Sequence, residues 1–494
     1  MRINKIAYAL SALALCLCLL AACSGKSESL NPKANSSEDL VGHKVGCLTG
    51  SLCDLQFDDF AAGAHKHIFN TEADLLTALD NRRVDFIVFD SIAIVGIDQK
   101  IHHTEISFSV PGIGGDIGVA FRKEDTDLCK QYNEFLAQIK SDGTYNGMLD
   151  RWFSDKVDTS TMPDIEEYTS GEPLNVGSLL GVPFCFIKNG DWVGFEVEMM
   201  KRYAAWLHRP VDIKTYDFSA LMAALKAGTI DVWCSFITIN EERSKEVLFS
   251  DAYYHCNVAI FQRTDDTASS VVPFHQKVWN SFHNNLIVED RWKMLLDGVW
   301  ETLIIAFFSL VFGTILGGVI CALRMSRNKF LSGFAKVYVE ILRGVPMLVL
   351  LMVMFYVVLA STGISARWVA IISFAINFSA YVCEIFRTGI DAVDKGQTEA
   401  GLAMGFSPLR TFFLFIVPQA AKNILPVFKN EAISLVKGTS IVGYIAIQDL
   451  TKMSDIIRSR TFDAFFPLII ISIIYFILAW LLGKALDAIS DKIA

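Results

Sequence analysis

LLTALDNRRVDFIVFD, residues 75–90, has a counterpart later in the chain, LMAALKAGTIDVWCSF at 221–236. The two stretches match at Leu75/Leu221, Ala78/Ala224, Leu79/Leu225, Val84/Ile230 and Asp85/Asp231. Each pattern predicts the end of an apolar helix, a turn, and a short apolar strand that begins at an aspartate. Units of this kind place helices on a mainly parallel sheet, so two copies predict two similar α/β lobes. Small ligands bind in the cleft between such lobes, beyond the carboxyl ends of the strands.

The distribution of apolar residues divides the chain into two parts. Hydrophobic residues make up 52% of the 494 positions, and the longest uncharged runs lie after residue 298. Three runs are long enough to cross a bilayer as a helix: 303–323, 344–365 and 464–483. With the weaker candidates 368–383 and 430–447, we expect an all-α transmembrane domain of five helices. The net charge of -9 and the lack of a basic stripe argue against a nucleic-acid partner.

The N-terminus, MRINKIAYALSALALCLCLLAACSGK, has the features of an export signal. Arg2 and Lys5 precede an apolar run that ends in small residues. The LAAC sequence that ends at Cys23 resembles a bacterial lipobox, which implies a lipoprotein-type signal peptide over 1–23 and lipidation of the Cys23 thiol. An uncleaved membrane anchor is the alternative. Residues 24–39 are polar and without periodicity, as in a flexible tether.

The loop charges predict an orientation. If residues 24–298 are outside, the segments that face the cytoplasm hold ten Lys and Arg residues, and the outward loops hold four. Three of those four, Lys452, Arg458 and Arg460, lie in one loop and weaken the bias without reversing it. We therefore expect a multi-pass protein of a bacterial inner membrane, with its binding part on the periplasmic side.

ITINEERSKEVLFSDAYY at 237–254 and WVGFEVEMMKRYAAWL at 192–207 resemble the first half of a known family. This family is the bacterial extracytoplasmic binding proteins for polar amino acids, whose fold is a two-lobed clamshell. KVGCLTGSL at 44–52 resembles its second half, and DGTYNGMLDRWF at 142–153 resembles its C-terminal end.

The order of these segments is inverted relative to the family, so the resemblance implies a single, circularly permuted clamshell. Residues 40–155 are then the second-lobe and C-terminal part, 156–173 link the old ends, and 174–266 are the first-lobe part. Termini that lie close together make such a rearrangement tolerable. Two incomplete or swapped binding domains are the alternative, although each half alone would leave a sheet uncovered. In the permuted topology the lobe with Arg243 has no membrane attachment, and we expect it to be the lobe that moves.

The resemblance also implies a ligand site. Arg243 would bind the carboxylate of an amino acid and Asp90 its ammonium. Five further positions would line the cleft through side chains or backbone groups: Thr238, Phe236, Phe218, Gly50 and Ser51. The backbone of Phe236 and the N–H groups of the Gly50-Ser51 turn are expected to form hydrogen bonds with the ligand.

The pattern departs from the family where selectivity is set. Ser178 and Gly181 stand where glutamine-binding relatives carry an acid and an aromatic residue. The α-amino-acid contacts are retained, but the side-chain pocket does not match glutamine. The nine histidines have no Cys/His framework around them, so we expect no metal site.

The membrane part, 299–494, follows a juxtamembrane segment at 267–298 and resembles the permeases of ABC importers. EAGLAMGFSPLRTFFLFIVP at 399–418 resembles their EAA loop, with Glu399, Ala400 and Gly405 at matching positions. In that family the loop forms short cytoplasmic helices that dock into the ATPase. GxxxxGK[ST] is absent from the chain, so we expect a separate ATPase subunit to hydrolyse ATP and no cofactor to bind here.

The fourth predicted span is polar. Asn430, Ser434 and Lys437 fall on one helix face, and with Thr439 they are candidates for the translocation path. Contacts between helices are an equal alternative for any one of them. Because one such permease makes half a pore, we expect a homodimer or a paired second permease.

The function that fits these features is the binding and membrane-spanning subunit of an ATP-driven importer of polar amino acids, and not an enzyme. The alternative is a ligand-gated ion channel of the glutamate-receptor type. In those channels the membrane segments interrupt the clamshell, whereas here they follow it.

Overall fold

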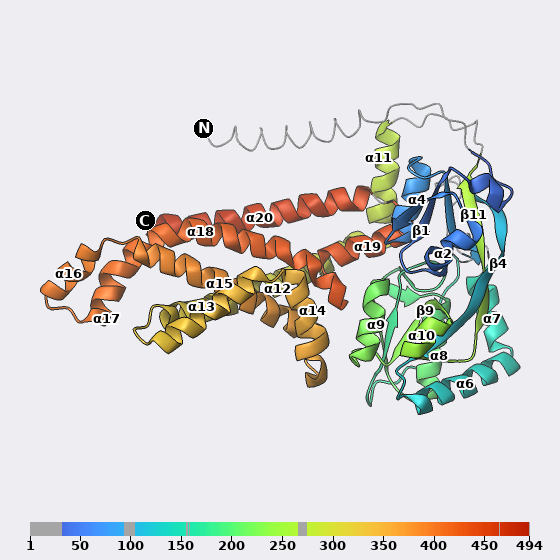
Figure 1. Cartoon of the computed structure of the whole chain (residues 1–494), viewed down its shortest axis with the longest axis horizontal. Coiled ribbons are helices and arrows are strands. Elements are labelled where there is room, and N and C mark those ends of the chain that lie inside the picture. Colours follow the sequence, from blue (N-terminus) through green and yellow to red (C-terminus); the bar gives the residue numbers. More distant parts are fainter. Residues whose placement is uncertain are drawn as a thin grey trace.

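The computed structural model has an α/β part and a helical part at opposite ends of an elongated molecule (Figure 1). It describes residues 32–92, 104–154, 157, 159–264, 274–463 and 465–493. Cys23, the first half of the 24–39 tether and the start of the 267–298 segment lie outside the described residues. The described residues of the 156–173 linker form no helix or strand.

A mixed nine-stranded sheet forms the α/β part, in the order β2-β1-β3-β11-β4-β9-β5-β8 with β10 on β4. One side has three parallel strands: β1 (Lys44–Leu48), β2 (His65–Phe69) and β3 (Phe86–Asp90). The other side has three more: β5 (Leu174–Ser178), β8 (Val211–Thr215) and β9 (Val232–Thr238). We call these two sides the Asp90 lobe and the Arg243 lobe. The predicted α/β class is confirmed.

Two long antiparallel strands connect the lobes. β4 (Thr104–Phe121) pairs with β11 (Tyr254–Arg263) over much of its length, and its end pairs with β9 and with β10 (Leu248–Phe249). β11 also pairs with β3, so each of the two strands takes part in both halves of the sheet.

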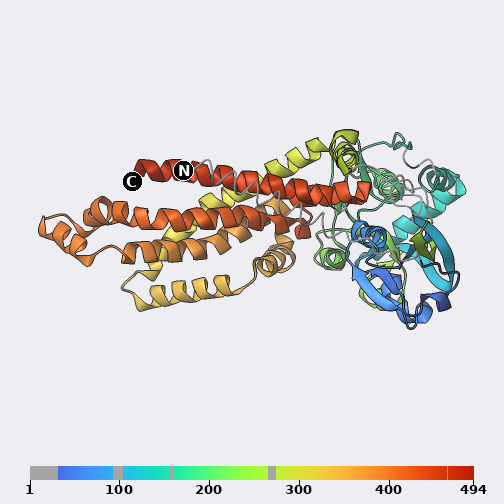
Figure 2. The same cartoon turned by 90° about the horizontal axis from the view of Figure 1, so that it is seen from above.

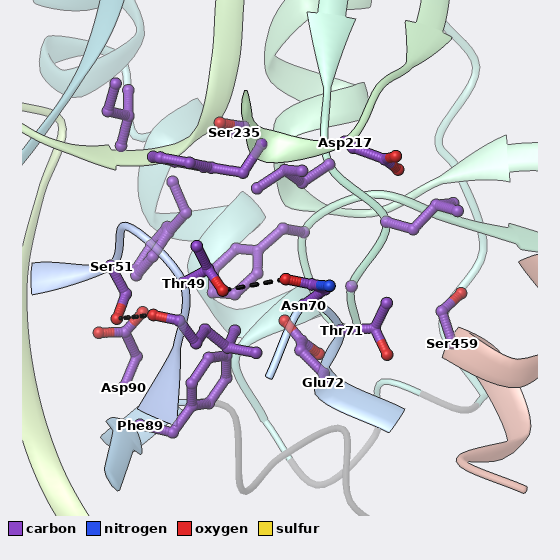
Figure 3. A pocket seen from close by; sticks show the side chains of 18 of the residues that line it. Thr49, Ser51, Asn70, Thr71, Glu72, Phe89, Asp90, Asp217, Ser235 and Ser459 are labelled. Atoms are coloured by element: carbon purple, nitrogen blue, oxygen red, sulfur yellow. Dashed lines mark hydrogen bonds between the residues drawn. The ribbon is translucent and has the colours of Figure 1, made fainter. Parts of the chain in front are cut away.

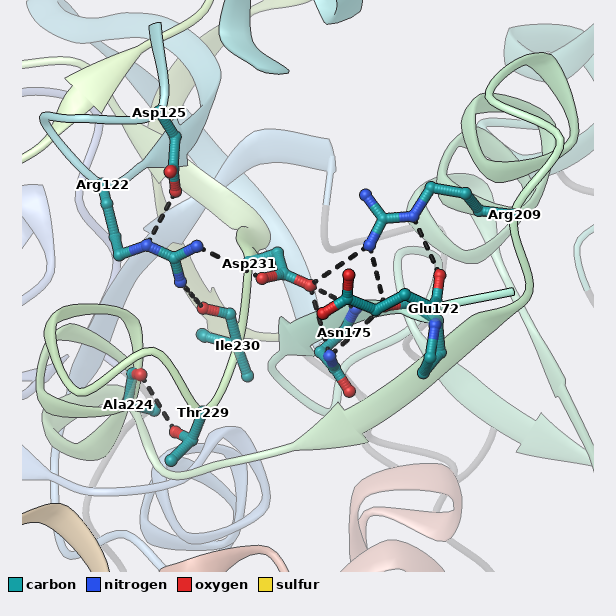
Figure 4. Close-up of polar contacts among 10 residues, drawn as sticks. Arg122, Asp125, Glu172, Asn175, Arg209, Ala224, Thr229, Ile230 and Asp231 are labelled. Carbon is teal, nitrogen blue, oxygen red and sulfur yellow. Dashed lines mark hydrogen bonds and ion pairs between the residues drawn. The ribbon is translucent and has the colours of Figure 1, made fainter. Parts of the chain in front are cut away.

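The repeat in the sequence is present as two matching units, α4 (Glu72–Asp80) with β3 and α9 (Phe218–Lys226) with β9. The aspartates have the same role in each. Asp85 accepts a hydrogen bond from the backbone N–H of Lys44 at 3.0 Å. Asp231 accepts one from the backbone N–H of Asn175, also at 3.0 Å (Figure 4). Each carboxylate therefore satisfies an N–H group near the start of the neighbouring parallel strand.

The helices that precede the linker pack on the lobe that follows it. α6 (Thr126–Ser141) and α7 (Thr144–Trp152) share a hydrophobic core with α8 (Phe195–Trp206) of the Arg243 lobe. Trp152 is fully buried, and its indole N–H donates to the Glu198 carboxylate at 2.7 Å. The smaller elements are η1 (Ser37–Leu40), α2 (Leu52–Leu55), α3 (Phe57–Phe60), α10 (Glu241–Glu246) and the hairpin of β6 (Phe186–Lys188) and β7 (Asp191–Val193).

The helical part begins with α11 (Phe274–Phe282), η3 (His283–Ile287) and η4 (Val288–Asp290). Its long helices are α12 (Trp292–Arg324), α15 (Ala366–Asp391), α18 (Val417–Gly438) and α20 (Phe466–Ile493). Four segments among the described residues are long and apolar enough to cross a membrane: Trp292–Arg324, Ala366–Asp391, Pro408–Ile445 and Phe466–Ala488. A bent pair of helices makes a fifth if it counts as one span.

Two of the predicted spans differ from the structure. The run 344–365 is no single helix, because α13 (Lys329–Gly344) stops before Pro346 and α14 (Met347–Val353) leaves at 106°. Proline lacks an N–H group and disfavours helix at the residue before it. η5 (Met354–Val358) and η6 (Ala360–Thr362) complete this segment.

The fourth span starts well before residue 430. α17 (Pro408–Thr411), η7 (Phe412–Ile416), α18 and η8 (Thr439–Ile445) follow one another as one helical segment. The first half of this segment was not predicted, because the charged and polar residues of 417–430 interrupt the uncharged run.

The two ends of the helical part are different. α16 (Lys395–Ala403) and α17 lie at the end farthest from the sheet, whereas α19 (Leu450–Thr461) lies beside it (Figures 1 and 2). α19 contacts α4 of the Asp90 lobe and β6 of the Arg243 lobe. The Arg243 lobe therefore packs directly on the membrane part, a contact that the sequence did not predict, and the expected motion of this lobe stays a prediction.

Candidate functional site

A cavity of about 190 Å³ lies between the two lobes, where β3 and β9 end (Figure 3). Its walls come from three places: the Asp90 lobe, the Arg243 lobe and helix α19. Of the predicted ligand-binding residues, six line this cavity: Arg243, Asp90, Thr238, Phe236, Phe218 and Ser51. The structure thus brings together residues from both halves of the binding part.

Arg243 lies in α10, whose N-cap Asn240 accepts a hydrogen bond from the Arg243 backbone N–H at 2.8 Å. Its guanidinium lies over the ring of Phe218, at 5.3 Å from the ring centroid. Nη1 donates to the Thr238 carbonyl at 3.0 Å, and Nη2 donates across the cleft to the Gly50 carbonyl at 2.9 Å. Burial lowers the pKa of Arg243, but a guanidinium stays cationic at neutral pH. The described residues give it no carboxylate partner.

Asp90 ends β3 and lines the cavity from the opposite lobe, close to Ser51 (Figure 3). Burial raises its pKa to about 6, and a hydrogen bond with the Cys256 side chain acts in the opposite direction. At neutral pH the carboxylate is therefore available to a cation in the cleft.

The Gly50-Ser51 turn differs from its expected role. The Gly50 N–H donates to the Asp54 carboxylate at 2.7 Å, and the Ser51 N–H donates to the Leu48 carbonyl at 3.2 Å. Both groups are thus already paired within the Asp90 lobe. Gly50 has a φ of +70°, and a Cβ there would lie 3.2 Å from the Phe218 ring, so the turn requires glycine. What Gly50 offers to the cleft is its carbonyl.

The backbone of Phe236 is also occupied. Its N–H donates to the Glu196 carboxylate, and Phe236 has a φ of +52°. The hydroxyls of Tyr253 and Ser178 donate to the same carboxylate at 2.8 and 3.4 Å. Burial raises the pKa of Glu196 to about 7. Glu196 thus holds the backbone of Phe236 and the hydroxyls of Tyr253 and Ser178 in place. Phe236 contributes its ring to the cavity, and the centroid of this ring lies 4.0 Å from that of Phe184.

The cavity-lining residues that sequence reasoning missed include one charged residue of α4, Glu72, and four polar residues of α19: Lys452, Asp455, Arg458 and Ser459. Lys452 pairs with Asp217 of the Arg243 lobe at 3.2 Å, and Arg458 pairs with Asp74 of the Asp90 lobe. Three cations in one outward loop, against the usual charge bias, were the signal that could have identified α19.

Apolar contacts extend the junction between α19 and the two lobes. Leu180 and Trp192 of the Arg243 lobe lie against the cluster around Ile456 and Ile457. Phe462, directly after α19, is buried in a cluster with Leu75 of the Asp90 lobe. One helix of the membrane part therefore contacts both sides of the cleft.

The EAA-like residues lie at the far end of the helical part. Glu399 and Ala400 are exposed on α16, and Gly405 has a φ of +85° in the turn before α17. Four large apolar side chains around them are more than two-fifths exposed: Leu402, Met404, Leu409 and Phe413. This end thus has an exposed apolar surface, to which Leu402 and Met404 contribute ahead of the Pro408–Ile445 segment and Leu409 and Phe413 from its start.

The four candidates for the translocation path separate into two groups. Asn430, Ser434 and Lys437 are exposed on one face of α18. Thr439 is fully buried, and its hydroxyl donates to the Val436 carbonyl at 2.7 Å. Only the first three share a surface.

Comparisons with known proteins agree with both parts. The profile of the binding-protein-dependent transport system inner membrane component family matches residues 298–493, and that of bacterial extracellular solute-binding proteins, family 3, matches 65–155. An arginine transport system permease protein of Bacillus subtilis is 35% identical over 198 residues, which are 39% of this chain and 90% of that protein.

An L-cystine transport system permease protein of the same organism is 33% identical over 211 residues, which are 42% of this chain and 90% of that protein. A solved amino acid ABC transporter with histidines is 36% identical, with a TM-score of 0.39, and covers 45% of this chain and 99% of its own. The chain therefore belongs to the binding-protein-dependent transport system inner membrane components, and it carries a family 3 solute-binding region ahead of its permease region.

Proposed function

We propose that this chain is the binding and membrane-spanning subunit of an ATP-driven importer of polar amino acids. The observation that carries the proposal is the cleft itself, where Arg243 and Asp90 line one cavity from opposite lobes. An α-amino acid carries a carboxylate, which pairs with the Arg243 guanidinium, and an ammonium, which pairs with the Asp90 carboxylate. The named relatives are permeases for arginine and cystine, which are both α-amino acids.

The binding part is a circularly permuted clamshell with the boundaries 40–155, 156–173 and 174–266. Packing of α6 and α7 on the Arg243 lobe supports this, because these helices precede in sequence the strands that they cover. The two matched aspartates support a single pair of lobes over two incomplete domains.

The permease region works as a pair, most simply as a homodimer. Asn430, Ser434 and Lys437 support this, because a polar face on a membrane helix needs a water-filled path or a second subunit beside it. We do not assign Thr439 to the translocation path, since its side chain is buried within one subunit.

The α16–α17 end docks on a cytoplasmic ATPase subunit, with Glu399, Ala400 and Gly405 at the contact. Its exposed apolar side chains and its position away from the binding part support this role. ATP is then hydrolysed by the partner, and this chain needs no cofactor.

The membrane is the inner membrane of a bacterium, with the binding part on its periplasmic side. Cleavage before Cys23, which removes residues 1–22, and lipidation of the Cys23 thiol would give the binding part a second, flexible attachment. The glutamate-receptor alternative has no support, since the candidate spans found among the described residues all follow the clamshell.

The test uses the full-length protein in detergent micelles and isothermal titration calorimetry with the twenty amino acids. At least one should bind to the wild type, and Arg243→Ala and Asp90→Ala should each abolish that binding. The proposal fails if no amino acid binds, or if both variants bind as the wild type does.

A further inference from the structure

Glu72 lies in the cleft, and no residue in the described part of the chain forms an ion pair with its carboxylate. It is the first residue of α4, after the N-cap Thr71, and its side chain lines the cavity together with Asp90 (Figure 3). The carboxylate also reaches the opposite lobe: a Cβ on Gly181 would lie 2.9 Å from Glu72 Oε1. The absence of a side chain at Gly181 thus leaves the room that Glu72 occupies.

The repeat gives Glu72 a matched position in the other lobe. The alignment that pairs Leu75 with Leu221 also pairs Glu72 with Phe218, and both begin a nine-residue helix at the cleft. Phe218 lines the cavity beside Arg243. By the internal symmetry of the lobes, Glu72 faces the same space from the opposite side.

Most other charges around the cavity are already paired. Lys452 pairs with Asp217, and Arg458 pairs with Asp74 and with Asp455. The Glu196 carboxylate accepts the three hydrogen bonds described above.

Three charged groups that line the cavity therefore remain without an opposite charge among the described residues: Arg243, Asp90 and Glu72. A neutral α-amino acid compensates the first two through its carboxylate and its ammonium. It would leave Glu72 without an opposite charge in a closed cleft, so Glu72 would have to keep a proton instead of ionising.

We propose that Glu72 binds a cationic group at the end of the ligand's side chain, so that the substrates are basic amino acids. This rests on the proposed function, because it takes Arg243 and Asp90 as the sites for the α-carboxylate and α-ammonium. The raised pKa of Glu72, about 8 through burial and the nearby Asp90, agrees with a site that favours an added positive charge. The lysine or arginine side chain has an apolar stem, and Phe89, Phe218 and Leu48 provide apolar walls for it.

The experiment compares L-lysine with L-norleucine, which has the same chain length without the terminal ammonium. Full-length protein in detergent micelles is titrated with each by calorimetry. The wild type should bind lysine at least about tenfold more tightly than norleucine. Glu72→Gln should remove that preference and change norleucine affinity little. Glu72→Lys should reverse the preference toward L-glutamate. Asp58→Asn, an exposed acid on the same lobe, is the matched control.

The outcomes separate this inference from the proposed function. Equal affinity for lysine and norleucine in the wild type, or an unchanged preference in Glu72→Gln and in Glu72→Lys, overturns the role of Glu72 while amino-acid binding stands. Absence of binding by any amino acid, with no effect of Arg243→Ala, overturns the proposed function itself. Melting temperatures of each variant identify loss of folding, and the Glu72→Lys reversal cannot arise from an unfolded protein.

Discussion

The guanidinium of Arg243 donates to the carbonyl of Gly50 across the cleft, at 2.9 Å, although the two residues lie 193 positions apart in the chain. This bond joins the lobes directly and holds the cleft in a closed arrangement. It uses one of the five N–H groups of the guanidinium, and a second goes to Thr238, so donors remain for a ligand carboxylate.

Arg243→Lys should weaken amino-acid binding nearly as much as Arg243→Ala. A lysine ammonium keeps the charge but lacks the planar fork that reaches Gly50 and a carboxylate together. We expect a loss of about 2–5 kcal/mol in binding free energy for either variant, measured by calorimetry. Arg83→Ala, an exposed arginine in the Asp90 lobe, should have no effect. Full retention of affinity in Arg243→Lys would show that charge alone is sufficient.

Binding of lysine should release protons and strengthen as the pH rises from 5 to 8. Burial raises the pKa of Glu72 to about 8 and that of Asp90 to about 6, so at pH 7 the empty cleft holds a proton mainly on Glu72. A bound cation favours the ionised carboxylates and so lowers both pKa values. Titration in buffers of different ionisation enthalpy counts the released protons.

Glu72→Gln should abolish the rise in lysine affinity between about pH 7 and 8, which comes from Glu72. The rise near pH 6, which comes from Asp90, should remain. Glu196 also titrates, with a pKa of about 7, but it is present in both proteins and cancels in the comparison. The same proton release in Glu72→Gln and wild type would contradict the assignment. In the empty protein, the raised pKa values predict stability that falls as the pH rises from about 4 toward 8, and lysine should reduce that loss.

Charge reversal in α19 should open the cleft without removing the ligand site. Arg458→Asp breaks the pair with Asp74, and Lys452→Glu breaks the pair with Asp217. Both aspartates are partly exposed, so each pair should contribute at most about 1 kcal/mol. Ser459→Cys lines the cavity and provides a reporter, since all eight described cysteines are buried. Maleimide should react with it faster in the charge-reversed variants.

Asp74→Arg combined with Arg458→Asp should restore slow labelling, because it re-forms the pair in reverse. The coupling energy comes from a double-mutant cycle over these variants. Labelling rates that add without coupling would indicate that the two side chains do not act on each other.

Glu399→Gln should lower amino-acid-stimulated ATP hydrolysis in the assembled transporter and leave amino-acid affinity unchanged. Glu399 is exposed at the far end of the permease region, away from the cleft. Glu340→Gln, an exposed glutamate on α13, is the control. A fall in affinity with unchanged ATPase stimulation would mean that the ends of the chain have been given the wrong roles.

The fold could be predicted from the sequence where neighbouring residues determine an element. The repeat predicted two α/β lobes, because an apolar helix, a turn and Asp85 or Asp231 lie within sixteen residues of each other. The bend at Pro346 was missed because hydropathy continues through it unchanged. The start of α18 was missed because its polar face interrupts the apolar run.

The candidate site was predictable only in part. Arg243 and Asp90 could be found because they stand in recognisable motifs. Glu72 could not, since only its match with Phe218 in the repeat points to the cleft. The three cations of the α19 loop were a sign that this loop is unusual, but its place at the cleft could not be predicted, because its contacts depend on how two distant parts of the chain dock together.

The junction between α19 and the lobes has a kinetic consequence. In a two-component system a free binding protein must find its permease by diffusion, and a weak contact would rarely be occupied. Here β11 and α12 belong to one chain, so docking is intramolecular and its effective concentration is on the order of millimolar. A few partly exposed ion pairs are then sufficient for frequent engagement, and they remain weak enough to release after each cycle. Added salt should therefore slow transport through the lifetime of the docked state and not through the rate of encounter.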